Sequence, residues 1–353
     1  MLSVLLAHWT PTGTILHAVF NGKAGYTLFF VLSGYLISRI LFNERIKETP
    51  ISKALSLFYA RRTLRIFPIY YLTLFVVWTF GLIPSNIWSY IMYFQNIQFA
   101  INDSFDGVNS HLWSLAVEEQ FYLVWPFMML LTPKQHLLKA IVISAAIGPL
   151  SRLVGIEWFG AIGKNIEMIQ LLTPTTLDCF GMGALLAYFE TYRFDSYLKF
   201  VRSLGPLLIG ITGVLLYLVF RHFREGILDD LFHRTVISLW CIYLIPLNFR
   251  INTSRYSQTL VFKAFLHIGK VSYGMYLFHN YVKVWFDWFR AYLIQNLNSE
   301  TLVAMINATT ENKIQFVLLT ILTIALASFS WWLIESPINK LKRFFPYSQT
   351  IRG

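Results

Sequence analysis

Apolar runs alternate with short polar segments along nearly the whole chain. A helix needs about 20 mostly apolar residues to cross the hydrocarbon core of a bilayer. Runs of this kind cover residues 25–43, 63–83, 113–132, 137–153, 172–190, 204–220, 234–249, 266–286 and 314–334. The pattern predicts an all-α fold, a polytopic membrane helix bundle that forms a single transmembrane domain over residues 1–353.

Two further segments are less regular. Residues 86–100 are rich in aromatic side chains and are expected to form a half-buried or re-entrant helix. Residues 1–7 are apolar but would rise only about 10 Å as a helix, and the Trp-Thr-Pro-Thr-Gly stretch at 9–13 then interrupts the pattern. We therefore expect a truncated first helix, which brings the expected total to about ten transmembrane helices.

Composition supports a membrane protein. Of the 353 residues, 56% are hydrophobic and 13% are charged, whereas roughly 25% of a soluble domain is charged. The net charge of +11 suggests a nucleic-acid partner, but the basic residues lie between the apolar runs, so we expect no nucleic acid. Cys179 and Cys241 lie inside apolar runs, and no metal-binding spacing of His or Cys is present, so we expect no metal.

The distribution of basic residues predicts an orientation. Residues 84–112 contain no Lys or Arg. The segment that follows the run at 25–43 is rich in both and contains Arg45, Lys47, Lys53, Arg61, Arg62 and Arg65. Because Lys and Arg accumulate in the cytoplasmic loops of membrane proteins, this asymmetry predicts that both termini are cytoplasmic.

Two carboxylates, Glu118 and Glu119, interrupt the apolar run at 113–132. A charged side chain at the centre of a membrane helix costs about 2.5–3.5 kcal/mol on insertion scales, so it needs a partner or a task. On a helix, Ser114, Glu118 and Tyr122 share one stripe, while Glu119 points elsewhere. The pattern favours Glu118 as a functional acid, with Ser114, Glu119 and Tyr122 as supporting polar groups. A packing ion pair with an arginine of a neighbouring helix is the structural alternative.

Other polar residues of the apolar segments are candidates for chemistry. His8 ends the first helix and has the pKa range of a general base, although a hydrogen-bonded interfacial histidine fits equally. Arg62 and Arg65 share a helix face and suit a phosphate, although an orientation signal or a lipid headgroup contact also explains them. Asp178 and His279 lie in apolar runs and are either functional or structural.

Several segments resemble the acyltransferase 3 family of integral membrane O-acyltransferases, and the similarity extends over essentially the whole chain. The segments are 28–37 (LFFVLSGYLI), 61–70 (RRTLRIFPIY), 113–126 (WSLAVEEQFYLVWP), 272–279 (SYGMYLFH) and 334–337 (IESP). The resemblance implies about ten helices, an acyl-CoA co-substrate, no permanently bound cofactor, and acyl transfer to a hydroxyl that is usually part of a carbohydrate. We expect a stand-alone member, without the esterase-like domain that many relatives carry after the last helix.

The resemblance also implies roles for single residues. His8 matches the family histidine at the end of the first helix, Arg62 and Arg65 match an Arg-x-x-Arg pair, and Glu118 matches a motif glutamate. A family arginine eleven residues before the histidine would fall before residue 1. Either the true start lies upstream, as the short first helix favours, or the chain lacks this residue and is impaired, which would fit a catalytically inactive interaction protein. At Thr176 many relatives have an arginine, and its absence weakens the case for a role of Asp178.

These inferences predict an enzyme of the bacterial inner membrane that moves an acyl group, acetyl being preferred, from acetyl-CoA to a carbohydrate hydroxyl. Surface polysaccharide, lipid-linked sugar, nodulation-type oligosaccharide and a macrolide-like molecule are alternative acceptors. Arg62 and Arg65 would hold the CoA phosphates, and His8 would act as the base. Glu118 would orient His8 or bind the acceptor. The pantetheine arm would thread the bundle between these groups.

A transporter of a small solute or acyl group is the alternative function. Intramembrane carboxylates and histidines also serve proton coupling. Many transporters contain inverted repeats, and the two halves of this sequence show no clear repeat.

Overall fold

Helices form all of the regular structure in the part of the chain that the computed structural model describes, and no strand occurs there. This confirms the all-α prediction. The described residues are 1–9, 22–83, 86–203, 205, 207, 210–213, 227–250, 259–296 and 312–347. The predicted helix at 204–220 therefore lies largely outside the described residues.

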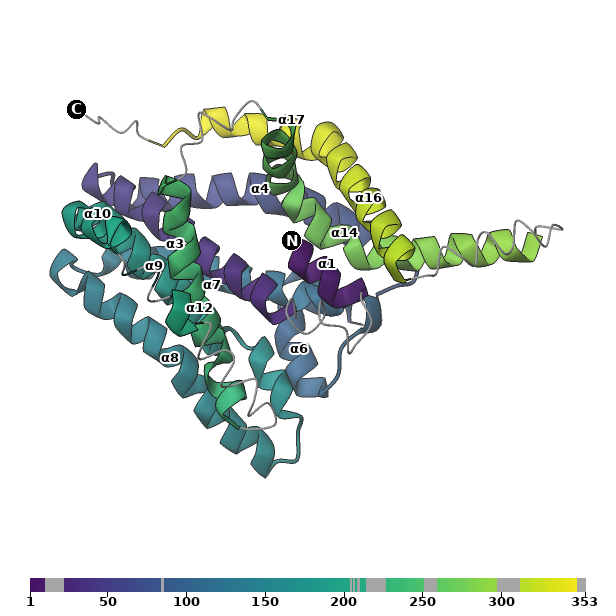
Figure 1. The fold of residues 1–353 in the computed structure, drawn as a ribbon, viewed down its shortest axis with the longest axis horizontal. Coiled ribbons are helices and arrows are strands. Elements are labelled where there is room, and N and C mark those ends of the chain that lie inside the picture. The colour runs from purple at the N-terminus through teal and green to yellow at the C-terminus, as the bar shows by residue number, and fades with distance from the viewer. Residues whose placement is uncertain are drawn as a thin grey trace.

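Long helices build the body of the molecule (Figure 1). They are α3 (Gly22–Ile46), α4 (Ile51–Thr79), α7 (Trp113–Leu131), α8 (Lys134–Ala161), α9 (Leu177–Tyr192), α12 (Ile227–Arg250), α14 (Leu260–Asn296) and α16 (Asn312–Ser330). Some begin earlier than the apolar runs predict, because a proline sets the first turn. Pro50 precedes α4 and Pro133 precedes α8, and the fixed φ of proline suits a helix start.

Shorter elements connect these helices. They are α1 (Leu2–Trp9), α5 (Ile87–Ile91), α6 (Gln95–Asn102), η1 (Gly107–Leu112), η2 (Ile166–Leu171), η3 (Thr173–Thr176), α10 (Phe194–Arg202), η4 (Trp331–Glu335), α17 (Ser336–Lys340) and η5 (Leu341–Phe344). The single helix predicted at 86–100 is wrong, because α5 and α6 form two short helices. Tyr93 between them has a φ of 55°, which breaks the helix.

Three described helical segments are long and apolar enough to cross a membrane, at Lys23–Ile46, Lys134–Ala161 and Ile314–Phe344. They support an integral membrane helix bundle. The total of about ten transmembrane helices stays a prediction. In Figure 1 the short helix α1 lies inside the assembly, where it contacts α3 and α16.

Helices α3 and α9 cross at very short range through two glycines. A Cβ atom at Gly34 would lie 2.1 Å from the carbonyl oxygen of Phe180, and one at Gly183 would lie 2.0 Å from that of Val31. Small residues let helix backbones approach in this way inside membranes. The crossing fixes α3, which carries Ser33 of the candidate site.

Gly183→Ala is expected to lower the free energy of unfolding by about 1–3 kcal/mol, because its methyl group would force the two backbones apart. Thermal and denaturant unfolding of the purified protein in detergent measure the loss. Gly160→Ala in α8 is the control, since an added Cβ there meets nothing within 4 Å. Equal stability of the two variants would contradict the close crossing.

Candidate active site

A cavity of about 290 Å³ lies between α3, α4, α7 and α14. Apolar and aromatic side chains form much of its wall, as in most small-molecule sites. Its polar lining residues are Tyr26, Ser33, Arg62, Arg65, Ser114, Glu118, Glu119, Tyr122, Ser272, Tyr273 and Tyr276. The structure thus brings together on one cavity the predicted arginine pair and the polar residues predicted on the run at 113–132.

Glu118 is held by a hydroxyl group rather than by an arginine. The Ser33 hydroxyl donates a hydrogen bond to Oε1 of Glu118 over 2.7 Å, and its oxygen lies 3.0 Å from the phenol oxygen of Tyr122. Among the described residues no ion pair joins Glu118 to an arginine, so the packing ion pair considered from the sequence is not observed. Arg62 instead lies over the ring of Tyr122, at 4.7 Å.

Glu119 and Gln120 follow Glu118 on α7 and have different surroundings. Glu119 also lines the cavity, although helical spacing placed it on another face. The cavity extends round α7 toward α4 and α14, so residues about 100° apart on the helix both reach it. Gln120 turns away and donates hydrogen bonds to the carbonyl oxygen of Tyr93 and to Oδ1 of Asn96, at 2.7 and 2.9 Å.

The arginines of α4 have distinct surroundings. Arg62 and Arg65 line the cavity. Arg65 lies over the ring of Trp331, at 5.1 Å, and its Nη1 is 4.0 Å from Oε2 of Glu335. Glu335 ends the π-helical turn η4, and such turns are frequent at functional sites. One carboxylate therefore faces Arg65, whereas Arg62 makes no ion pair within 4.0 Å among the described residues and lies over the Tyr122 ring.

Three histidines that are distant in sequence form a cluster. The ring centroid of His279 lies 4.9 Å from that of His8 and 4.7 Å from that of His111. Nδ1 of His279 is 2.6 Å from the carbonyl oxygen of Tyr276, so Nδ1 carries the proton and Nε2 is an acceptor. His111 and His279 are buried, whereas His8 is exposed.

Tyr276 lies between the cavity and this histidine cluster. It lines the cavity, and its ring centroid is 5.6 Å from that of His279. Its hydroxyl donates to the carbonyl oxygen of His111 over 2.8 Å and lies 2.5 Å from the Ser114 hydroxyl. His8 does not line the cavity. The residues that line the cavity and the histidine cluster are therefore adjacent, and Tyr276 lies between them.

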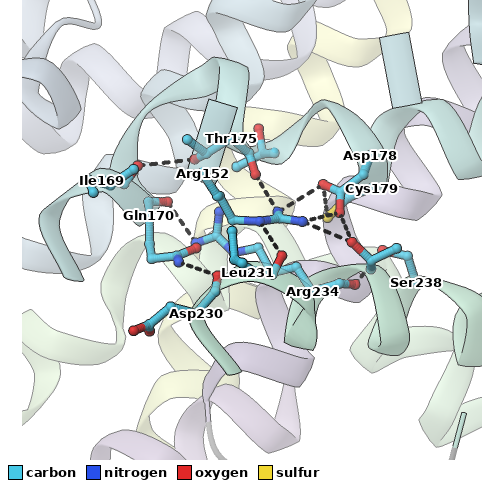
Figure 2. A network of polar contacts seen from close by, with 12 residues as sticks. Arg152, Ile169, Gln170, Thr175, Asp178, Cys179, Asp230, Leu231, Arg234 and Ser238 are labelled. Atoms are coloured by element: carbon cyan, nitrogen blue, oxygen red, sulfur yellow. Dashed lines mark hydrogen bonds and ion pairs between the residues drawn. The ribbon is translucent and has the colours of Figure 1, made fainter. Parts of the chain in front are cut away.

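Asp178 belongs to a different network, which is largely buried and joins α8, α9 and α12 (Figure 2). Nη2 and Nη1 of Arg152 donate to its two oxygens, at 2.7 and 3.2 Å, and Thr235 donates to Oδ2 over 2.5 Å. The side chains of Arg152 and Asp178 are 0% and 1% exposed. A bidentate pair of this kind satisfies both ions, so the structural interpretation of Asp178 is favoured.

The sequence interpretation missed several of these residues. Arg152 and Arg234 lie in or beside apolar runs. Because an intramembrane cation requires a partner, the ion pair between Arg152 and Asp178 could have been predicted from the sequence. Arg234 is 1% exposed, donates to the carbonyl oxygen of Gln170 over 2.7 Å and lies over the ring of Tyr26. No local spacing distinguished His111, because its ring contacts Leu277 and Asn280 of α14 as well as the nearby carbonyl oxygen of Val108.

The sequence of the chain matches the model of a known protein family. The sequence model of a family described as an acyltransferase domain, Acyl_transf_3, matches residues 1–333. No solved structure gives a significant match.

Curated relatives are O-acetyltransferases. The chain is 28% identical over 349 residues to O-acetyltransferase OatA of Staphylococcus aureus (strain NCTC 8325 / PS 47), with 91% of this chain and 53% of the relative covered. It is 26% identical over 345 residues to peptidoglycan O-acetyltransferase OatA of Listeria monocytogenes serovar 1/2a, with 91% and 52% covered. The chain spans about half the length of these relatives.

Proposed function

This chain belongs to the acyltransferase 3 family, and from that premise we propose that it transfers an acetyl group from acetyl-CoA to a hydroxyl of a cell-surface carbohydrate. The relatives support acetyl as the group and a carbohydrate such as peptidoglycan as the acceptor, since those words appear in their names. The observation that carries the proposal is one cavity with two arginines and a hydrogen-bonded carboxylate, next to an exposed histidine.

In the proposed reaction the acceptor oxygen attacks the thioester carbonyl carbon while His8 takes the hydroxyl proton. The Ser114 and Tyr122 hydroxyl groups, which bond Tyr276 and Ser33 in this structure, turn to stabilise the negative charge that develops on the carbonyl oxygen. The carbon–sulfur bond then breaks, the ester forms, and the proton on His8 passes to the departing CoA thiolate. Tyr276 lies between the cavity and His8, so the thioester approaches Tyr276 from the cavity and the acceptor from the His8 side.

The donor enters from the arginine side. Arg62 and Arg65 bind phosphate oxygens of CoA, and Glu118, held by Ser33, orients the reacting groups. We place the arginines at the cytoplasmic face, with both termini inside and the protein in a bacterial inner membrane, because of the Lys and Arg distribution and because acyl-CoA is cytoplasmic.

A label-transfer assay tests the function. Purified protein is supplied with acetyl-CoA labelled in the acetyl group and with peptidoglycan fragments or other surface glycans, in detergent without a gradient. Alkali-labile label in the glycan is the expected product, because an O-acetyl ester is hydrolysed by base. Protein that carries label across vesicles without modifying any glycan would instead be a transporter and would overturn the proposal.

Arg62→Ala is expected to raise the KM for acetyl-CoA by about tenfold or more, since a hydrogen bond to a charged group contributes about 1.5–3 kcal/mol. The kcat at saturating donor should change little, because the phosphate contact is the same in the ground state and the transition state. Initial rates over a range of donor concentrations separate the two constants. Arg193→Ala is the control, because Arg193 does not line the cavity. An unchanged KM in Arg62→Ala would exclude the phosphate role.

A further inference from the structure

Residues 342–347 are held by Arg61 at the arginine-rich end of α4. Nη1 of Arg61 donates hydrogen bonds to the carbonyl oxygens of Lys342 and Phe345, at 3.0 and 2.9 Å. Its guanidinium group also lies over the ring of Tyr347, at 4.5 Å. Figure 1 shows these yellow C-terminal elements running alongside α4. Arg61 therefore positions a segment that is about 280 residues away in sequence.

This fastening brings another cation to the arginine pair. The ammonium group of Lys342 is within electrostatic range of Arg61, Arg62 and Arg65. Lys342 makes no ion pair with a carboxylate in the described part of the chain. Glu335 is the carboxylate that faces Arg65, and at 4.0 Å it offsets one charge of the group. Lys342 belongs to η5, which packs against α4 and is held there by the Arg61 hydrogen bond, and the like charges gathered at this end of α4 repel one another unless an anion binds among them.

We propose that Lys342 binds a phosphate of the nucleotide donor that lies outside the cavity, beside the phosphates held by Arg62 and Arg65. The inference rests on the proposed function. CoA carries a diphosphate and a separate 3′-phosphate on its ribose. Arg62 and Arg65 line the cavity and Lys342 does not, so the diphosphate, which leads to the pantetheine arm, faces the arginines. The 3′-phosphate, at the nucleoside end, faces Lys342.

The experiment compares two donors that differ only in the proposed ligand group. Acetyl-CoA and acetyl-dephospho-CoA, which lacks the 3′-phosphate, are used with the full chain in uncharged detergent. Binding is measured calorimetrically and KM by initial rates. The wild type is expected to prefer acetyl-CoA by about tenfold, the usual effect of a charged hydrogen bond. Lys342→Gln should remove this preference with an unchanged kcat, because Lys342 does not line the cavity.

Matched variants complete the design. Lys340→Gln removes the same charge from the adjacent exposed turn and should keep the preference. Lys342→Arg should restore it, which shows that the Gln variant failed through charge rather than through folding. Measured with both donors, the variants form a thermodynamic cycle that gives the coupling energy between the Lys342 side chain and the 3′-phosphate.

Other outcomes separate the inference from the proposed function. A wild type that transfers acetyl groups while Lys342→Gln keeps the donor preference overturns the role of Lys342 alone. Anionic lipid headgroups share phosphate chemistry, so binding to phosphatidylglycerol vesicles is measured in parallel. A Lys342→Gln variant that loses only vesicle binding would assign the cation to lipid and overturn the inference. A wild type with no transfer from acetyl-CoA overturns the proposed function itself.

Discussion

His8→Ala is expected to lower kcat by about 10²–10⁴-fold, the usual contribution of a positioned general base. His8 is the exposed member of the histidine cluster, and the buried rings of His279 and His111 cannot reach an acceptor in its place. KM for acetyl-CoA should stay nearly unchanged, because the donor phosphates bind at Arg62 and Arg65. Initial rates of acetyl transfer at saturating donor measure the effect.

The control for this loss is another exposed histidine. His136 lies in α8, and its ring contacts the amide of Gln135. His136→Ala should therefore keep the activity of the wild type. If His8→Ala retained more than about a tenth of the wild-type kcat, the assignment of the base would be abandoned.

Asp178→Ala is expected to lower the free energy of unfolding by about 3–5 kcal/mol, because it leaves the guanidinium of Arg152 buried without a carboxylate. The pair is almost completely inaccessible, at 0% and 1% exposure. The loss should appear in denaturant unfolding of the purified protein in detergent. Replacing both partners, as Arg152→Met with Asp178→Leu, should recover much of the loss, because no charge then remains unpaired.

An exposed ion pair provides the comparison. Lys283 and Asp287 lie one turn apart on α14, and their side chains are 41% and 33% exposed. Asp287→Ala should lower the free energy of unfolding by less than about 0.5 kcal/mol, since such pairs contribute little. Similar losses for Asp178→Ala and Asp287→Ala would show that the buried network is not a structural anchor.

Local spacing predicted the features that lie within one helix. Ser114, Glu118 and Tyr122 share a stripe on α7, and the structure places all three on the cavity. Arg62 and Arg65 share a face of α4 and line the same cavity. In each case the period of the α-helix fixes which side chains share a face, although it does not predict that Glu119, on another face of α7, also lines the cavity.

Local spacing in the sequence could not predict contacts between distant segments. The hydrogen bond between Ser33 and Glu118 joins α3 to α7, and the neighbouring rings of His8 and His279 come from α1 and α14. The position of Lys342 depends on backbone carbonyl groups that accept from Arg61, which no side-chain pattern encodes. Such pairings follow from how the helices pack, and the period of a single helix does not determine that packing.

The hydroxyl of Tyr276, anchored by His111 and Ser114, has a consequence for the electrical integrity of the membrane. A continuous water column through a bilayer would conduct protons and discharge the gradient that drives cellular work. The Tyr276 side chain lies between the cavity and the histidine cluster and interrupts such a column there. In the proposed reaction the acetyl group passes this point while covalently attached, so the transfer requires no continuous water path.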